Sequence, residues 1–443
     1  MLPLLHRRDA DKATRLARAI LMLYGTIYYI IPMLLTATLG QPLDAILAGS
    51  PNYTLGSAFI LTVLGLTWFT CGKIRAPSFA WLQPFATAIF GRFVILGASV
   101  AYLLLAYWYS QELGISFRQT GDRIGSSGGF VIVFLSLQGY IFAALLLTLG
   151  MNDELQQQAG WPITTALALI VIGSLLSLSA ASGVVLVATS LLLLLRHIRA
   201  IDLIGASGIG QTFLALTALG VVFILALFVG IANKVGVEEA MYMFSNELDA
   251  VIYRFQYRIS WHFFSASFHL TYNFADFSLG VQAVREVLSA ISHRLDVLLG
   301  NPTYFNEVAS VRRLNWEELS LVKRERTGAS PGMVASVFFV PGGVFMLPVS
   351  IVVYALLLLM IAKAASGRKL SIFGLIFLVV YYSGVADSSI DLLNPLDPAF
   401  LKLTFLALAC ASYSPASRSA GDERVEASRY STTTTRAAAQ LGR

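Results

Sequence analysis

Apolar runs long enough to cross a membrane alternate with short basic clusters along almost the whole chain. A membrane-spanning helix needs about 20 apolar residues, and Ile20–Gly40 and Leu55–Gly72 are two of several such runs. Of the 443 residues, 56% are hydrophobic and only 13% are charged. Soluble domains carry about twice that share of charged residues. The sequence therefore predicts an all-α integral membrane protein.

The basic clusters predict the orientation, because loops rich in Lys and Arg stay on the cytoplasmic side of a membrane. They stand at residues 7–18, 73–75, 196–199 and 363–369. The apolar runs between them give about ten spans, with both termini in the cytoplasm. We interpret the net charge of +6 as part of this orientation signal, so we expect the lipid bilayer as a partner and no nucleic acid.

This layout divides the chain into four parts. Residues 1–232 form spans 1–7, and residues 333–411 form spans 8–10. Between them, 233–332 is a large, partly helical loop that we expect on the periplasmic face. The Ser/Thr/Ala-rich tail at 412–443 has no apolar face, so we expect it to be disordered in the cytoplasm.

The large loop contains a basic and aromatic stretch, YRFQYRISWHFFSASFH, which runs from Tyr253 to His269. Arg254, Arg258 and His262 recur every four residues, so on a helix they share one face. We expect this helix at the membrane surface, with its cations on one side. The alternative is that the arginines are structural, with their charged ends reaching from an interfacial helix into water.

Two more amphipathic helices are predicted in this loop. Apolar residues recur at helical spacing from Val284 to Leu298, and the pattern stops at Leu299-Gly300. A third, shorter helix is expected from Asn315 to Arg326. Beyond the loop, Pro341-Gly342-Gly343 is expected to interrupt the eighth span.

Arginine is concentrated in the loops predicted to be periplasmic. Its planar guanidinium binds phosphate through two parallel hydrogen bonds and does not lose its proton. Two arginines one helical turn apart suit the two phosphates of a pyrophosphate. The sequence has no H-E-x-x-H motif and no Cys/His cluster, so we expect no metal and no cofactor. The arginines in the loops predicted to be periplasmic are Arg118, Arg123, Arg254, Arg258, Arg285, Arg294, Arg312, Arg313, Arg324 and Arg326.

Two stretches resemble a known family. FRQTGDRIGSSGGFVIVFLSLQGYIFAALLL (117–147) is similar to the arginine-then-glycine loop and following span of Wzy-type polymerases, which join repeat units of bacterial O-antigen and exopolysaccharide. RTGASPGMVASVFFVPGGVFMLPVS (326–350) is similar to the stretch by which those enzymes leave their large outer loop. With the ten-span layout, the resemblance covers about residues 15–410 and depends on pattern more than on invariant motifs.

The resemblance implies a bacterial inner-membrane glycosyltransferase with a GT-C-like fold, whose substrates are oligosaccharides linked to undecaprenyl pyrophosphate. A chain-length regulator protein is a further partner of such enzymes. The family's loop arginines correspond here to Arg118, Arg123, Arg254 and Arg258, and we expect Arg326 to bind substrate with them. The acceptor hydroxyl benefits from a base. Candidates for that base are His262, His269, Glu247 and Asp249, and Asp249 has the alternative role of capping the helix that follows it.

Two other functional classes stay open. An O-antigen ligase-type transferase needs the same pyrophosphate site as a polymerase. A polysaccharide flippase or transporter shares the many spans, but transporters commonly place ionisable residues inside them. The apolar runs of this chain are poor in charge, which favours an enzyme.

Overall fold

The structure is a computed structural model, and the part of the chain that it describes is predominantly helical. It describes residues 2–39, 48–120, 129–150, 153–177, 228, 232, 236–299, 310–321, 328–366, 370, 372–387 and 389–412. These residues include no β-strand, in agreement with the all-α prediction. The helices are α1 (Leu2–Gly25), η1 (Thr26–Ile30), α2 (Ile31–Leu39), α3 (Tyr53–Cys71), η2 (Ala80–Leu82), α4 (Gln83–Ile89), α5 (Arg92–Thr120), α6 (Gly129–Gly150), α7 (Asp153–Ser177), α11 (Val237–Asn246), α12 (Leu248–Tyr272), α13 (Ser278–Leu298), α14 (Val311–Leu319), α15 (Gly332–Ala335), η4 (Ser336–Phe339), η5 (Gly343–Met346), α16 (Leu347–Ala365), α17 (Ile372–Ala386), η6 (Ser389–Leu393) and α18 (Pro398–Ser412).

Within the described ranges, three helical segments are long and apolar enough to cross a membrane. They are Lys12–Thr38, Tyr53–Cys71 and Gly343–Ala365, which match the predicted spans 1, 2 and 8. A fourth arises if Ala80–Ile89 and Arg92–Trp108, bent by 59°, count as one broken span. These helices are consistent with a membrane protein.

Four shorter apolar helices coincide with other predicted spans: Ser136–Leu149, Gly160–Ser174, Gly374–Ala386 and Ala399–Ser412. They are too short to count as spans by length alone. The predicted sixth span and almost all of the seventh lie outside the described residues, as does the tail beyond Ser412. The ten-span layout, its orientation and the periplasmic position of 233–332 therefore stay predictions.

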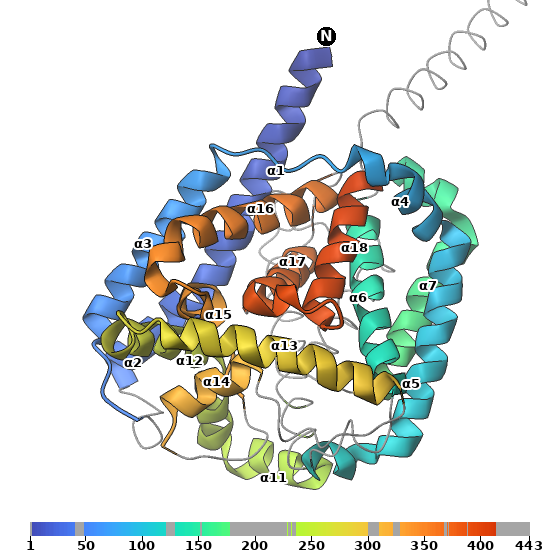
Figure 1. Ribbon diagram of the computed structural model, residues 1–443. Coiled ribbons are helices and arrows are strands. Elements are labelled where there is room, and N and C mark those ends of the chain that lie inside the picture. Colours follow the sequence, from blue (N-terminus) through green and yellow to red (C-terminus); the bar gives the residue numbers. More distant parts are fainter. Residues whose placement is uncertain are drawn as a thin grey trace, which may run out of the picture.

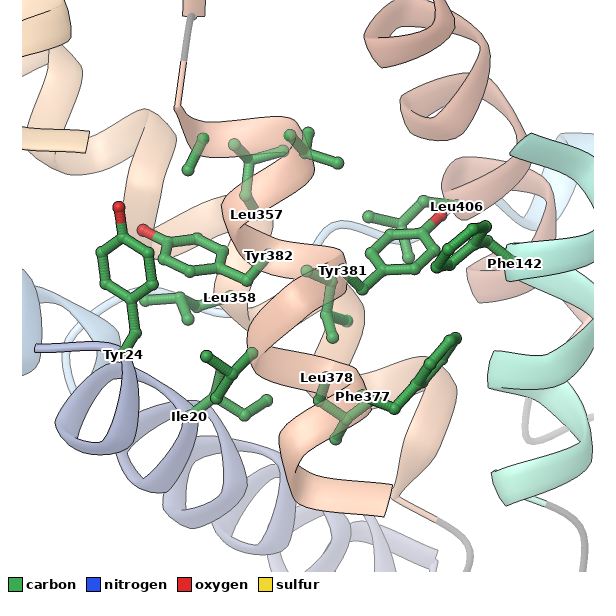
Figure 2. Close-up of a cluster of buried hydrophobic side chains, with 14 of the residues drawn as sticks. Ile20, Tyr24, Phe142, Leu357, Leu358, Phe377, Leu378, Tyr381, Tyr382 and Leu406 are labelled. Atoms are coloured by element: carbon green, nitrogen blue, oxygen red, sulfur yellow. The ribbon is translucent and has the colours of Figure 1, made fainter. Parts of the chain in front are cut away.

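The bundle is arranged around α17, as Figure 1 shows. On one side α1 and α3 lie beside α16, and on the other α18 packs along α6 while α5 packs along α7. Side chains from α1, α6, α16 and α18 meet those of α17 in one apolar core (Figure 2). Buried tyrosines and phenylalanines fill this core, among them Tyr24, Phe142, Phe377, Tyr381 and Tyr382.

The segment predicted to lie at the membrane surface is a helix, α12, but its second half is an interior element. Every residue from Ile259 to Leu270 is buried, and α12 packs on α3, η1 and α15. Small residues allow this close packing: Gly56 of α3 directly faces Ser267, where any side chain at Gly56 would overlap the serine. The surface prediction is therefore wrong for this half. Its own aromatic and small side chains lie on all faces of the helix, and all of them are buried in the protein.

The other predictions for this region hold in part. Helix α13 ends at Leu298, as its stop signal predicts. Helix α14 begins at Val311, earlier than expected, because the Ser310 hydroxyl accepts a hydrogen bond from the Arg313 N–H and caps it. Residues 322–327 lie outside the described chain. The interruption near Pro341 is real: Gly342 has a φ of 97°, and helix resumes only afterwards, as η5 and then α16.

Candidate functional site

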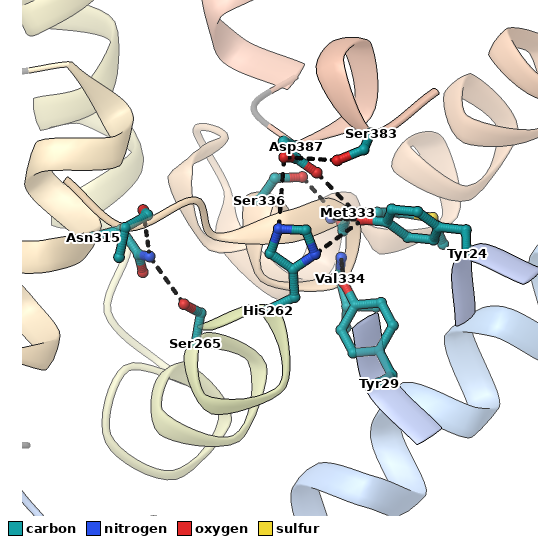
Figure 3. A network of polar contacts seen from close by, with 11 residues as sticks. Tyr24, Tyr29, His262, Ser265, Asn315, Met333, Val334, Ser336, Ser383 and Asp387 are labelled. Carbon is teal, nitrogen blue, oxygen red and sulfur yellow. Dashed lines mark hydrogen bonds and ion pairs between the residues drawn. The ribbon is translucent and has the colours of Figure 1, made fainter. Parts of the chain in front are cut away.

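His262 lies in the buried half of α12, at the point where four distant parts of the chain meet. Its side chain is surrounded by tyrosines of α1 and η1, by the segment around Gly332, and by Asp387, which follows α17 (Figure 3). The residue is only 4% exposed. A histidine that is buried with polar groups on both sides of its ring is a strong candidate for a functional group.

Both ring nitrogens of His262 face polar partners. Nε2 lies 3.5 Å from Oδ2 of Asp387, an ion pair when the imidazole is protonated. Nδ1 lies 3.5 Å from the hydroxyl of Tyr24, and that hydroxyl is 3.3 Å from the other carboxylate oxygen of Asp387. His262, Asp387 and Tyr24 thus form a closed triangle of polar contacts, which we call the histidine cluster (Figure 3).

Hydrogen-bond accounting shows that the cluster can exist in two protonation arrangements. The Tyr24 hydroxyl accepts a bond from the Met333 N–H at 3.2 Å and has one proton to donate. That proton can go to Asp387 or to a neutral Nδ1 of His262. When Nε2 carries the imidazole proton and forms a hydrogen bond to Asp387, Nδ1 carries no proton and can accept one. In this arrangement the cluster can act as a base.

A local irregularity of the first helix places two tyrosines here. Thr26–Ile30 forms one turn of π-helix, in which residues five apart point in nearly the same direction, whereas in an α-helix they point in different directions. Tyr24 and Tyr29 therefore both reach the segment after Gly332, where their oxygens accept the N–H groups of Met333 and Val334 at 3.2 and 3.1 Å. π-Helical turns are often found at functional sites.

Gly332 passes so close to His262 that only glycine fits. Its φ is 70°, in the left-handed region. A Cβ there would lie 2.6 Å from Cγ of His262 and 2.8 Å from the Tyr29 hydroxyl. This glycine fixes the backbone over the imidazole and holds the Met333 N–H toward Tyr24.

Asp387 carries its charge in a buried setting. Burial raises the pKa of its carboxyl, whereas the neighbouring His262 and the charge of Arg312 lower it, and the net pKa is below the ordinary value. The Ser383 hydroxyl donates to Oδ2 at 3.0 Å. An ionised Asp387 can orient the imidazole and stabilise its protonated form, as the carboxylate does in a Ser-His-Asp triad.

His269, the other predicted base candidate, has a different environment. It is fully buried, and both nitrogens are hydrogen-bonded: Nδ1 to the Asn273 amide at 2.9 Å and Nε2 to Oδ1 of Asn315 at 2.8 Å. The amide nitrogen of Asn315 donates to the Ala329 carbonyl at 2.9 Å, so Asn315 must turn its oxygen toward His269. Burial lowers the pKa of His269 to about 4, although the Asn315 hydrogen bond raises it. These contacts favour a positioning role over that of a base.

The acidic base candidates are far from the histidine cluster. Glu247 directly precedes α12 and Asp249 lies in its first turn; both are exposed. The N-cap position is held by Glu247, whose side chain makes no capping bond, so Asp249 is not the cap; as a carboxylate in the first turn it stabilises the helix dipole. Asp249 and His262 are 13 positions apart on this helix, a rise of about 20 Å. The structure does not bring these candidates together with the histidines.

The predicted arginines are only partly described. Arg254 and Arg258 lie on α12, two turns and one turn before His262, and Arg118 lies near the end of α5; their side chains are outside the described part of the structure. Arg123 and Arg326 are in segments that the structure does not describe. Among the described residues, no group of three or more His, Cys, Asp or Glu side chains could hold a metal ion.

Sequence reasoning found His262 but missed its partners. Asp387 is the first residue of DSSIDLLNPLD, an acidic stretch that resembles an ordinary turn between two spans. An aspartate directly at the end of an apolar helix was the available signal. Tyr24 and Tyr29 belong to YGTIYY, inside the first apolar run, where tyrosine is easily taken for core.

The chain matches no protein-family model, and the comparisons with curated proteins and with solved structures found no match either.

Proposed function

We propose that this protein is a membrane glycosyltransferase that joins oligosaccharide repeat units carried on undecaprenyl pyrophosphate, as a Wzy-type polymerase does. In this reaction a hydroxyl oxygen of the acceptor sugar attacks the anomeric carbon of the donor chain. The bond from that carbon to the pyrophosphate oxygen breaks, and undecaprenyl pyrophosphate leaves. The hydroxyl proton goes to a base, which we assign to His262.

The observation that carries this proposal is the buried contact of His262 with Asp387. A sugar hydroxyl is a weak nucleophile, and a positioned base typically accelerates such a reaction by about 10²–10⁴-fold. Nδ1 of His262, the nitrogen that would take this proton, faces the Tyr24 hydroxyl at 3.5 Å. Asp387, on the opposite nitrogen, would then stabilise the imidazolium that forms.

A second line of support comes from the segment that resembles the polymerase family. Residues 326–350 include Gly332, Met333 and Val334, and these are the residues that contact His262, Tyr24 and Tyr29. The resemblance and the base candidate were separate observations in the sequence. The segment that resembles the family and the candidate base lie in contact in the structure, which supports the proposal that both serve the same reaction.

The leaving pyrophosphate gains negative charge as its bond to the sugar breaks, and fixed guanidinium groups can stabilise that charge without a metal ion. Helix α12 is continuous through Arg254, Arg258 and His262, which follow one another at intervals of four residues. One helix would then provide both the base and the cations. We therefore keep these two arginines as the proposed pyrophosphate-binding residues, with Arg118, Arg123 and Arg326 as further candidates.

Glycan profiling of a deletion strain tests the proposal. Loss of a polymerase leaves single repeat units on their final carrier, and the long chains disappear. Loss of a ligase leaves long chains on the lipid carrier, and loss of a flippase leaves neither form at the cell surface. Complementation with the wild-type gene should restore the ladder of lengths, and complementation with Asp387→Asn should restore it poorly.

One observation favours a second candidate function, proton-coupled transport. Buried, paired ionisable groups among apolar helices are typical of proton relays in transporters, and His262 and Asp387 are such a pair. The same strain decides between the two. A transporter would leave its substrate on the cytoplasmic side, whereas a polymerase leaves unpolymerised units outside.

A further inference from the structure

The apolar surface of helix α13 is wider than the part that the rest of the protein buries. Its inner face is buried through Leu279, Ala283 and Val287, which pack on α14, on Phe339 and on Ile390 of η6. A second apolar row, Val281, Leu288 and Leu295, is exposed. Residues seven apart in a helix point in nearly the same direction, so these three form one line along the helix.

A polar row lies beside this apolar row. It consists of the residues that directly follow the three apolar ones in sequence and lie about 100° further round the helix. These residues are Gln282, Ser289 and Asp296. The boundary between apolar and polar surface therefore runs parallel to the helix axis. A helix lying flat in a membrane–water boundary has this pattern, with one long edge in lipid and the other in water.

The start of α13 is fixed at the level where two candidate spans begin. Just before it, the Tyr272 hydroxyl donates to the Ser50 carbonyl at 3.1 Å, beside the first turn of α3. Phe277 packs on Phe345 with ring centroids 5.6 Å apart, and Phe345 lies in the first turn of the candidate span Gly343–Ala365. Figure 1 shows α13 running from this point across the general direction of α3 and α5.

We infer that α13 is an interfacial membrane helix whose Val281, Leu288 and Leu295 side chains enter the lipid. The partner of this surface is the bilayer itself, at the end of the bundle where α3 and α16 begin. Exposed aromatic side chains at the same end support this assignment, since Phe345 is 74% exposed and Phe274 is 51% exposed. The inference does not depend on the proposed function.

The test uses the full-length protein in vesicles of phosphatidylethanolamine and phosphatidylglycerol. Single cysteines are introduced at Val281, Leu288 and Leu295, and at Gln282 and Ser289 as matched controls on the same helix. The wild-type chain provides the blank, because its own two cysteines, Cys71 and Cys410, are buried. Each protein is labelled with an environment-sensitive fluorophore and is used only if it elutes like the wild type.

Two quenchers then report what surrounds each label. A nitroxide on the upper acyl chain should quench the labels at 281, 288 and 295 strongly, since an interfacial helix buries its apolar face by about 5–10 Å. A water-soluble quencher should instead reach 282 and 289. Equal quenching of all five by the aqueous quencher would overturn the inference, because the row would face water. Protection of 281, 288 and 295 from both quenchers would also overturn it, because protein would then cover them.

Discussion

Replacing Gly332 with alanine tests the geometry of the histidine cluster without altering any of its polar groups. The added methyl carbon would lie 2.6 Å from Cγ of His262, 2.8 Å from its Cβ and 2.8 Å from the Tyr29 hydroxyl. A φ of 70° adds about 1–2 kcal/mol for a residue with a side chain. Relieving the overlap adds about 1–3 kcal/mol. We therefore expect Gly332→Ala to destabilise the protein by about 2–5 kcal/mol.

The same overlap should also reduce activity. The methyl group displaces the imidazole or the segment above it, and the contacts of His262 with Asp387 and Tyr24, already at 3.5 Å, would lengthen beyond hydrogen-bonding range. A displacement of about 1 Å in a catalytic group can lower a rate by about 10²-fold. The assay is polymer formation per membrane-inserted protein, together with thermal unfolding in detergent.

Two other glycines provide matched controls for this substitution. A Cβ at Gly65 of α3 or at Gly97 of α5 would have no neighbour within 4 Å. Because alanine is about 1 kcal/mol better than glycine inside a helix, Gly65→Ala and Gly97→Ala should leave the protein unchanged or slightly more stable. If Gly332→Ala behaves like these controls in both assays, the close approach to His262 that we describe is wrong.

Three further predictions concern charge and protonation. Asp387→Asn should keep the shape of the side chain but lose its charge, so polymer formation should fall by about 10²-fold or more while membrane insertion persists; activity near wild type would exclude a role for the His262 contact. The pKa of His269 is lowered to about 4, against about 6.5 in an unfolded chain. The free energy of unfolding should therefore be constant with respect to this group above pH 6.5 and fall by about 3 kcal/mol as the pH falls to 4. Unfolding curves of His269→Gln should not show this loss. Arg254→Ala or Arg258→Ala should lower the rate by about 10²–10³-fold, with partial rescue by lysine, whereas full activity of the double lysine variant would assign the pair a structural role.

Local patterns predicted most of the helices because helix formation depends on short-range spacing. The recurrence of Arg254, Arg258 and His262 predicted α12, and the apolar spacing from Val284 predicted α13. Pro341-Gly342 likewise predicted the break before α16, since these residues disfavour helix wherever they stand.

Burial and partnership depend on the whole fold, so they could not be predicted in this way. The aromatic and small residues after His262 fit an interfacial helix as well as an interior one, and only the approach of α3 at Gly56 decides between them. Asp387 lies 125 positions after His262, and a single sequence has no signal that pairs them. The π-helical turn Thr26–Ile30 was also not predicted, although it decides where the hydroxyls of Tyr24 and Tyr29 point.

Reconstitution of the purified protein in liposomes tests the central claim most directly. The liposomes would contain an undecaprenyl-pyrophosphate-linked oligosaccharide and a metal chelator, and the products would be separated by length while released lipid pyrophosphate is counted. We predict a ladder of glycan lengths, one lipid pyrophosphate released for each bond formed, and a loss of about 10²–10⁴-fold in His262→Gln. A wild-type protein that forms no ladder under these conditions, or a His262→Gln variant that forms it at the wild-type rate, would contradict the assignment of His262 as the base of a glycan polymerase.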